Sequence, residues 1–161
     1  MKAAGIEAQE WLDSFTEVAR EFAAGSLRFD GAAAPSDLGS FKSGTNPAAY
    51  ISVLSESNSM HLGLSASMQG CRTLTRAFLG IREKDGISEK DVVDAMSEIL
   101  NILAGKVKSR LASRDGSLKL GLPIFLVGQI QVTKNMDRAV GDVEMGPVPC
   151  QVLVFRNRGG A

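Results

Sequence analysis

The sequence predicts an α/β (α+β) fold in which an antiparallel β-sheet is packed with two long helices and a shorter one. Two stretches have the 3.6-residue apolar period of amphipathic helices. Short runs rich in β-branched residues, separated by turn residues, predict paired strands. The chain has 161 residues, of which 44% are hydrophobic and 22% charged. This composition is typical of a folded domain with a sizeable core, and we expect residues 1–161 to form a single domain.

The first predicted helix covers Ile6 to Ala24. Its large apolar residues recur at steps of four, three and four, so they lie along one stripe that we expect to face the core. The acidic residues of the segment stay off this stripe, and Gly25 predicts the end of the helix. The stripe consists of Trp11, Phe15, Val18 and Phe22.

Residues 25–48 are rich in glycine, proline and small polar residues, which predicts a long surface loop. A β-hairpin is expected next, with strands at Tyr50 to Glu56 and His61 to Ser67 and a polar turn at residues 57–59. The shorter helix is predicted at Met68 to Leu79 and should end at Gly80.

The strongest helix signal begins at Ser88. Ser88 is a favourable N-cap residue, and Asp91 stands three positions later, as in a capping box. The helix should run to about Ala112, with one broad apolar arc facing the core. The arc consists of Val92, Met96, Ile99, Leu100, Leu103, Val107 and Leu111.

Four strand-like segments close the chain, and a proline, Pro123, separates the first two. They make a loose repeat of a helix followed by paired strands, a possible internal pseudo-repeat, although the helices share no sequence pattern. The expected segments are Leu118 to Leu122, Ile124 to Val132, Ala139 to Met145 and Pro149 to Arg156.

Composition and charge exclude several classes of function. Lys plus Arg and Asp plus Glu both number 18, so the basic surplus of a nucleic-acid or anionic-membrane binder is missing. No apolar run approaches the length of a membrane span, and no secretory signal is recognisable. Cys71 and Cys150 fit no metal-ligand spacing, and a single histidine, His61, cannot complete a zinc site. We expect two free thiols, no bound metal and a cytoplasmic protein.

Polar residues gather on the outward face of the helix that begins at Ser88. At about 100° per residue, Asp94, Glu98, Asn101 and Gly105 cluster opposite the apolar arc, and Ile102 flanks them. A glycine inside a helix costs about 1 kcal/mol relative to alanine, and close approach of another protein would explain it. The alternative is ordinary solvated surface, which is the usual role of glutamate and asparagine on an exposed helical face.

The run from Asp94 to Gly105 has the pattern D-x-x-x-E-x-x-N-x-x-x-G. This pattern resembles the signature helix of the CheC/CheX/FliY phosphatases. The downstream Leu122-Pro123, with Gly128 soon after, is similar to the strand end of the same family. The order of elements also resembles CheX, and a single helix of this type favours a one-site CheX-like protein over the two-site CheC arrangement.

The resemblance implies an enzyme that removes the phosphoryl group from the phospho-aspartate of a CheY-like response regulator. It implies that Glu98 and Asn101 are the catalytic residues. Asn101 would hold the attacking water, and Glu98 would pair with a lysine of the partner. Asp94, Ile102 and Gly105 would contact the partner, which would carry the Mg²⁺ ion itself, so that no cofactor is expected on this chain.

The resemblance further implies a homodimer that joins sheet edges. The run from Cys150 to Phe155 is uncharged and has high β propensity, as expected of an edge used for pairing. The alternative is a strand in the middle of its own sheet. Two other functions stay open at this point: a non-catalytic module that binds a response regulator or a flagellar-switch-like partner, and a purely structural dimeric domain.

Overall fold

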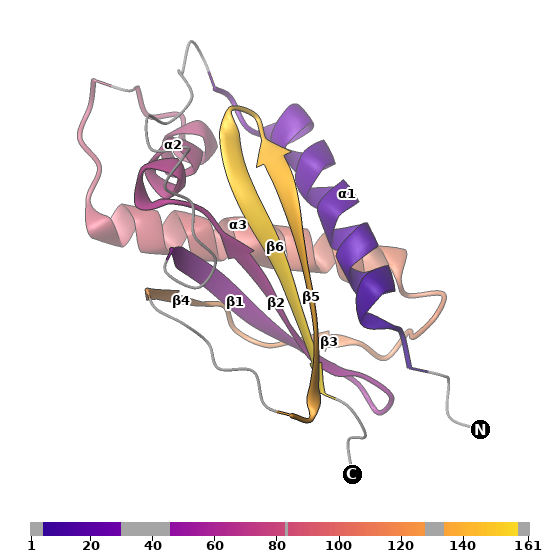
Figure 1. Ribbon diagram of the computed structural model, residues 1–161. Coiled ribbons are helices and arrows are strands. Elements are labelled where there is room, and N and C mark those ends of the chain that lie inside the picture. The colour runs from indigo at the N-terminus through magenta and orange to yellow at the C-terminus, as the bar shows by residue number, and fades with distance from the viewer. Residues whose placement is uncertain (1–4, 30–45, 83, 128–133, 158–161) are drawn as a thin grey trace.

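The computed structural model describes residues 5–29, 46–82, 84–127 and 134–157. Within these ranges the chain forms helices packed on one antiparallel sheet, as the sequence predicts (Figure 1). The helices are α1 (Ala8–Ser26), α2 (Met68–Leu79) and α3 (Glu89–Arg110). The strands are β1 (Pro47–Leu54), β2 (Ser59–Ser65), β3 (Lys119–Leu120), β4 (Ile124–Val127), β5 (Met136–Met145) and β6 (Val148–Asn157).

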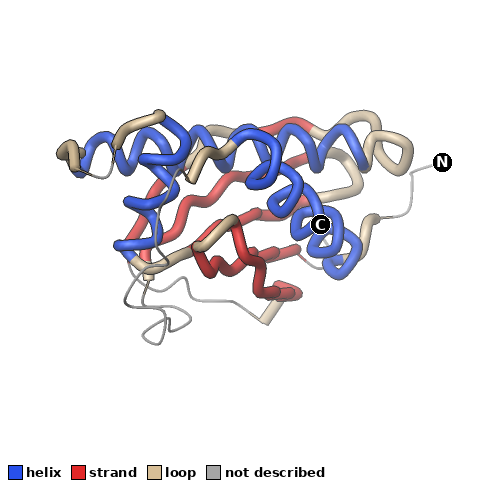
Figure 2. Tube along the Cα trace, turned by 90° about the horizontal axis from the view of Figure 1, so that it is seen from above, coloured by secondary structure: helices blue, strands red, loops and turns tan. Residues whose placement is uncertain are grey.

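The strands lie in the order β3-β1-β2-β6-β5, and β4 also pairs with β1, at the end opposite to β3. Every strand pair is antiparallel. In Figure 1 α3 passes behind the strands and α1 lies beside β5, and Figure 2 shows the molecule from above, with α3 running along one side of the strands. The main core therefore lies between this side of the sheet and the helices.

Both predicted apolar stripes are buried in that core. On α1, Trp11 and Phe15 are fully buried, and Val18 and Phe22 are nearly so. On α3, every residue of the predicted arc is buried, from Val92 to Leu111. Burying a large aliphatic or aromatic side chain is worth about 1.5–3 kcal/mol, so these contacts fix the rotation of each helix about its axis. The opposite face of α3 is thereby turned outward.

The predicted capping box at the start of α3 is confirmed. The amide of Asp91 donates to Ser88 Oγ at 3.1 Å, and the amide of Ser88 donates to Asp91 Oδ2 at 2.9 Å. The helix ends at Arg110 with Leu111 as its C-cap, slightly before the predicted end at Ala112. Two amides that have no intrahelical acceptor are satisfied in this way, and the first turn of α3 is fixed.

The prediction that Gly25 ends the first helix is wrong. The helix α1 continues through Gly25 to Ser26, and the chain then turns into an extended C-cap at Leu27. Leu27 is buried, as is Ala23 one turn before it. Packing of this last turn therefore decides where the helix ends, and the conformational freedom of glycine is not used there.

The β1–β2 hairpin is confirmed, but its turn lies earlier than predicted. The amide of Ser55 donates to the carbonyl of Asn58 at 2.8 Å, and Ser55 Oγ accepts from the amides of Ser57 and Asn58 at 3.2 and 3.0 Å. These bonds close the turn immediately after Leu54. The serine side chain competes with the strand ladder for backbone amides, which strand propensity alone does not capture.

A buried carboxylate, Asp115, joins the turn after α3 to this hairpin. It accepts hydrogen bonds from Asn58 Nδ2 at 2.8 Å, from Ser117 N at 2.9 Å and Ser117 Oγ at 2.7 Å, and from the Ser55 hydroxyl. The amide of Ile6, just before α1, donates to Asn58 Oδ1 at 2.9 Å. The hydrogen bonds from Ser55 and Ser117 hold the pKa of Asp115 well below its usual range. The cluster therefore holds the C-terminal end of α3 against the β1–β2 turn. This end of the helix follows the candidate site in the sequence.

Replacing Asp115 by alanine should lower the free energy of unfolding by about 2–3 kcal/mol, because buried donors lose a charged acceptor. Chemical denaturation at neutral pH measures the change. Asp94→Ala is the matched control, since Asp94 is exposed and its removal should cost less than about 0.5 kcal/mol. Equal effects of the two substitutions would contradict the role given to Asp115.

The same carboxylate predicts a pH dependence. Because the pKa of Asp115 is lower in the folded than in the unfolded protein, its stabilising effect is complete above about pH 4 and is lost as the pH falls below that value. Denaturation curves of Asp115→Asn should therefore depend less on pH in this acidic range than those of the unmodified protein.

The strand β6 lies inside the sheet, paired with β2 on one side and β5 on the other. The interpretation of Cys150 to Phe155 as an exposed edge is therefore wrong, and the alternative of a central strand is right. The uncharged composition of this run reflects pairing on both sides and contact with the core.

Pro123 interrupts the segment that follows α3, as predicted. The predicted strand at Leu118 to Leu122 is reduced to the two residues of β3, and β4 pairs with the other end of β1. The last five residues of the strand expected at Ile124 to Val132 lie outside the described residues. The same is true of most of the loop expected at residues 25–48, whose two ends belong to α1 and β1.

Candidate functional site

The candidate site is the outward face of α3. Glu98 is exposed and Asn101 is partly exposed, whereas their neighbours Ile99 and Leu100 are fully buried. Glu98 and Asn101 are three positions apart, so they project from the same side of the helix on successive turns. The predicted outward orientation is confirmed, and the roles assigned to the two side chains stay predictions.

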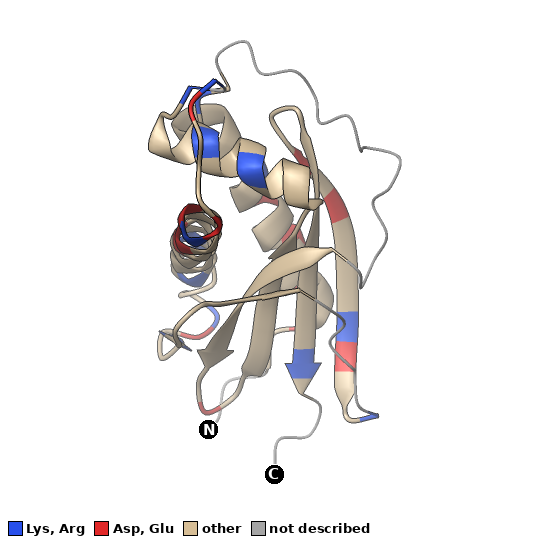
Figure 3. Cartoon of the chain, turned by 90° about the vertical axis from the view of Figure 1, so that its left-hand side faces the viewer, with Lys and Arg blue, Asp and Glu red and all other residues tan. Residues whose placement is uncertain are grey.

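Both polar side chains are available to a partner. Within the described part of the chain, neither Glu98 nor Asn101 has a side-chain hydrogen bond or an ion pair. Asp94, one turn earlier, differs, because its carboxylate accepts from Lys90 Nζ at 2.8 Å. Figure 3 views α3 end-on, with charged residues of its first turns at the near end of the helix. A carboxylate and an amide are therefore presented together, next to a carboxylate that is already paired.

A groove of about 540 Å³ lies between α1 and α3 and continues this face. The structure brings the predicted contact residues Ile102 and Gly105 together there. A Cβ built on Gly105 would have no described residue within 4 Å apart from its own turns of α3, so packing among the described residues does not require a glycine here. The remaining lining residues are Val18, Glu21, Lys106, Ser109 and Arg110.

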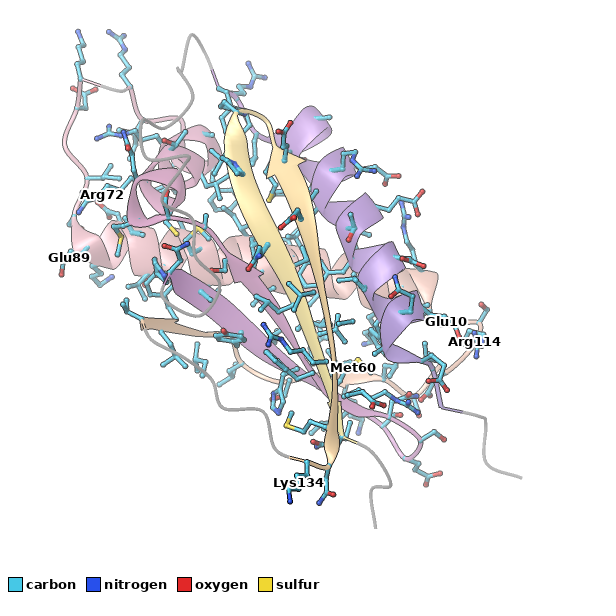
Figure 4. The ribbon with its side chains drawn as sticks, viewed as in Figure 1. Glu10, Met60, Arg72, Glu89, Arg114 and Lys134 are labelled. Carbon is cyan, nitrogen blue, oxygen red and sulfur yellow. The ribbon has the colours of Figure 1, made fainter. Side chains whose placement is uncertain are left out.

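Ion pairs between α1 and α3 hold the two walls of the groove. Arg110 Nη1 lies 3.0 Å from Glu17 Oε2, and its other terminal nitrogen pairs with Glu21. Arg114 pairs with Glu10 nearby, and Figure 4 shows these two side chains meeting beside the lower end of α1. Each exposed pair is weak by itself, but together the pairs help to fix the spacing of the helices.

Sequence analysis did not assign Lys106 or Arg110 to the site. Helical spacing alone predicts that Lys106 and Arg110 lie close to Ile102 and Gly105 on α3. The groove itself depends on α1, which lies more than 80 residues earlier in the chain. No local pattern predicts which helix packs beside α3.

His61 does not belong to the site. Leu62, the next residue on β2, points into the core on the face of the sheet where α3 packs. Because successive side chains of a strand point to opposite faces, His61 lies on the other face of the sheet. Its Nδ1 atom is 3.1 Å from Ser52 Oγ, and partial burial lowers the pKa of the imidazole. Its contact with Ser52 on the neighbouring strand gives His61 a structural role in the sheet.

The two cysteines, Cys71 and Cys150, are buried and form no disulfide, as predicted. Burial raises the pKa of the Cys150 thiol, which makes a thiolate unfavourable there. Among the described residues, no group of three or more histidine, cysteine, aspartate or glutamate side chains is placed to hold a metal ion. No helix within the same residues is long and apolar enough to span a membrane.

Comparison with known proteins gives a family match and a set of similar folds. The model of the family described as "Chemotaxis phosphatase CheX" matches residues 48–141, more than half of the chain and including all of α3. No curated protein matches the sequence.

Solved structures share the fold at low sequence identity. The chemotaxis protein CheX from Vibrio vulnificus superposes with a TM-score of 0.69 at 11% identity, covering 95% of this chain and 100% of that one. CheX in a CheX–CheY–BeF₃–Mg²⁺ complex from Borrelia burgdorferi gives 0.67 at 14% identity, covering 93% and 97%. The middle domain of FliM from H. pylori gives 0.57 at 10% identity, covering 93% and 91%.

Proposed function

The chain belongs to the CheX family of chemotaxis phosphatases, and we propose that it removes the phosphoryl group from the phospho-aspartate of a CheY-like response regulator. The observation that carries the proposal is the unpaired Glu98–Asn101 face of α3, held outward by the buried arc of the same helix. The Borrelia burgdorferi structure, in which a CheX is bound to CheY with BeF₃ and Mg²⁺, supports a receiver domain as the partner.

We propose that Asn101 positions the water that attacks phosphorus. The amide oxygen would accept a hydrogen bond from this water, and the amide nitrogen would donate one to a phosphoryl oxygen, with no change in protonation. Attack by the water breaks the bond between phosphorus and the aspartyl oxygen, and releases inorganic phosphate and a free aspartate carboxylate. Most of the rate in phosphoryl transfer comes from positioning and electrostatics, so a side chain that is not a nucleophile suffices.

Glu98 would hold the two proteins in register. Its free carboxylate would form a charge-assisted hydrogen bond with a lysine beside the phosphorylated aspartate of the partner. Asp94, Ile102 and Gly105 would complete the contact on either side. The Mg²⁺ ion that offsets phosphoryl charge would be held by the receiver, because the residues proposed for this chain only dock and orient.

A turnover assay tests this function. The protein, at one-tenth of the receiver concentration, should shorten the lifetime of each phosphorylated receiver domain it recognises and should act many times. A non-catalytic binding module, the alternative that the FliM-like fold leaves open, would act only in stoichiometric amounts or would lengthen the lifetime. Failure to accelerate hydrolysis on any receiver of the host would refute the proposal.

Gly105→Ala separates folding from docking. Because the new methyl group has no described residue within 4 Å apart from its own turns of α3, the substitution should raise the free energy of unfolding by about 0.5–1 kcal/mol. The same methyl group would stand between α3 and a closely docked receiver, so affinity for the receiver should fall severalfold. Thermal denaturation and binding measurements on one preparation check both effects. Gain of stability without loss of affinity would show that nothing docks closely at this position.

Homodimer formation through a sheet edge also remains a proposal. With β6 inside the sheet, the suitable edge is β4, which carries no charged residue. Ile124 and Val127 on this strand are 53% and 68% exposed, and Leu122 just before it is 88% exposed. An uncharged, apolar edge of this kind favours pairing with another strand.

A further inference from the structure

We infer that Lys106 determines which receiver is accepted, by pairing with a carboxylate on the receiver surface that lies over the groove between α1 and α3. The inference rests on the proposed function and adds a second charge to the docking face. The groove lining has no catalytic role in the proposed function. We infer that the groove binds an apolar side chain of the same receiver.

The charges of the groove leave one cation unpaired. Glu21 and Arg110 neutralise each other across it, and Glu17 adds a second contact to Arg110. Lys106 is exposed and has no hydrogen-bond or ion-pair partner among the residues that the structure describes. A partner seated in the groove therefore meets the unpaired ammonium group of Lys106, and a carboxylate is the complementary group.

The spacing along α3 fixes where this carboxylate must be. Lys106 follows Glu98 by eight residues, which corresponds to about 12 Å along the axis and about 80° around it. Glu98 attracts a cation and Lys106 an anion, so together they set both the position and the direction of a docked receiver. A receiver that carries a lysine and a carboxylate at matching positions satisfies both, and a reversed orientation opposes like charges.

The floor between the two charges is apolar and open. Ile102 and Val18 line the groove, and Gly105 contributes no side chain. Ser109 Oγ donates to the carbonyl of Gly105 at 3.1 Å, so this hydroxyl proton is already used within the helix. The floor thus fits an apolar side chain of the receiver. On the receiver, the lysine that pairs with Glu98 would lie on one side of this side chain, and the carboxylate that pairs with Lys106 would lie on the other.

Charge reversal with measured kinetics tests the inference. The substrate is each host receiver that the unmodified protein dephosphorylates, and beryllofluoride-activated receiver serves for binding. Lys106→Glu should raise KM and Kd at least tenfold and leave kcat within twofold, whereas Lys106→Arg should behave as the unmodified protein. Lys119→Glu, an exposed lysine on β3, is the matched control and should change neither value by more than twofold.

A compensating change identifies the partner group. One surface carboxylate of the receiver, when changed to lysine, should restore binding to the Lys106→Glu variant and weaken binding to the unmodified protein. If Lys106→Glu and Lys119→Glu behave alike while the unmodified protein still turns over, the inference about Lys106 is wrong and the proposed function stands. If the unmodified protein acts on no receiver, both are wrong.

Discussion

Asn101→Ala should lower the rate of receiver dephosphorylation at saturating protein by at least about 100-fold, the usual effect of removing one group that positions or stabilises a reacting atom. Binding of the beryllofluoride-activated receiver should change by less than about threefold, because the Glu98 contact and the groove remain. Single-turnover decay of phosphorylated receiver measures the rate, and titration calorimetry measures the affinity.

Misfolding would not explain this result. Asparagine has a lower helix propensity than alanine, so Asn101→Ala should keep or slightly raise the thermal stability of a helix whose buried face is untouched. Ser97→Ala, four positions earlier and also partly exposed, is the control and should retain full activity. Full activity of the Asn101→Ala variant would refute water positioning by this amide.

Glu98→Lys should impair binding and turnover together. It replaces an attraction for the partner's lysine by repulsion, and losing a hydrogen-bonded charge contact of this kind costs about 2–5 kcal/mol, or at least about 30-fold in Kd. Glu98→Gln should have a smaller effect in the same direction. Surface plasmon resonance over a range of salt concentrations measures the loss and its electrostatic character.

The matched control for this reversal is Glu89→Lys on the same helix. Glu89 is exposed in the first turn of α3, and Figure 4 shows it at the far left end of that helix. The same change of net charge should leave affinity within about twofold. If the two reversals weaken binding equally, a general charge effect explains the data, and Glu98 has no specific partner.

Local sequence predicts the helices and the outward face well, because their causes are local. The capping box joins residues three apart, and the apolar arc of α3 needs only the 3.6-residue period. The direction in which Glu98 and Asn101 point follows from that arc alone. The family pattern in the same helix then connects the face with phosphatase chemistry.

Features that depend on distant contacts were predicted poorly. Whether Cys150 to Phe155 forms an edge depends on pairing with β2, about 90 residues earlier in the chain. The length of β3 depends on how many residues of β1 are available to pair with it. The groove beside Gly105 requires α1, and the Asp115 cluster combines three separate segments. Periodicity carries no information on which segments meet.

The position of α1 has a consequence for how this chain folds during synthesis. The helix α1 packs against β5 and β6, which follow it by more than 100 residues, and Glu7 just before α1 pairs with Arg156 on β6. Until this hairpin leaves the ribosome, α1 lacks part of the surface against which it packs. A nascent chain that ends before residue 136 should therefore be sensitive to protease at α1.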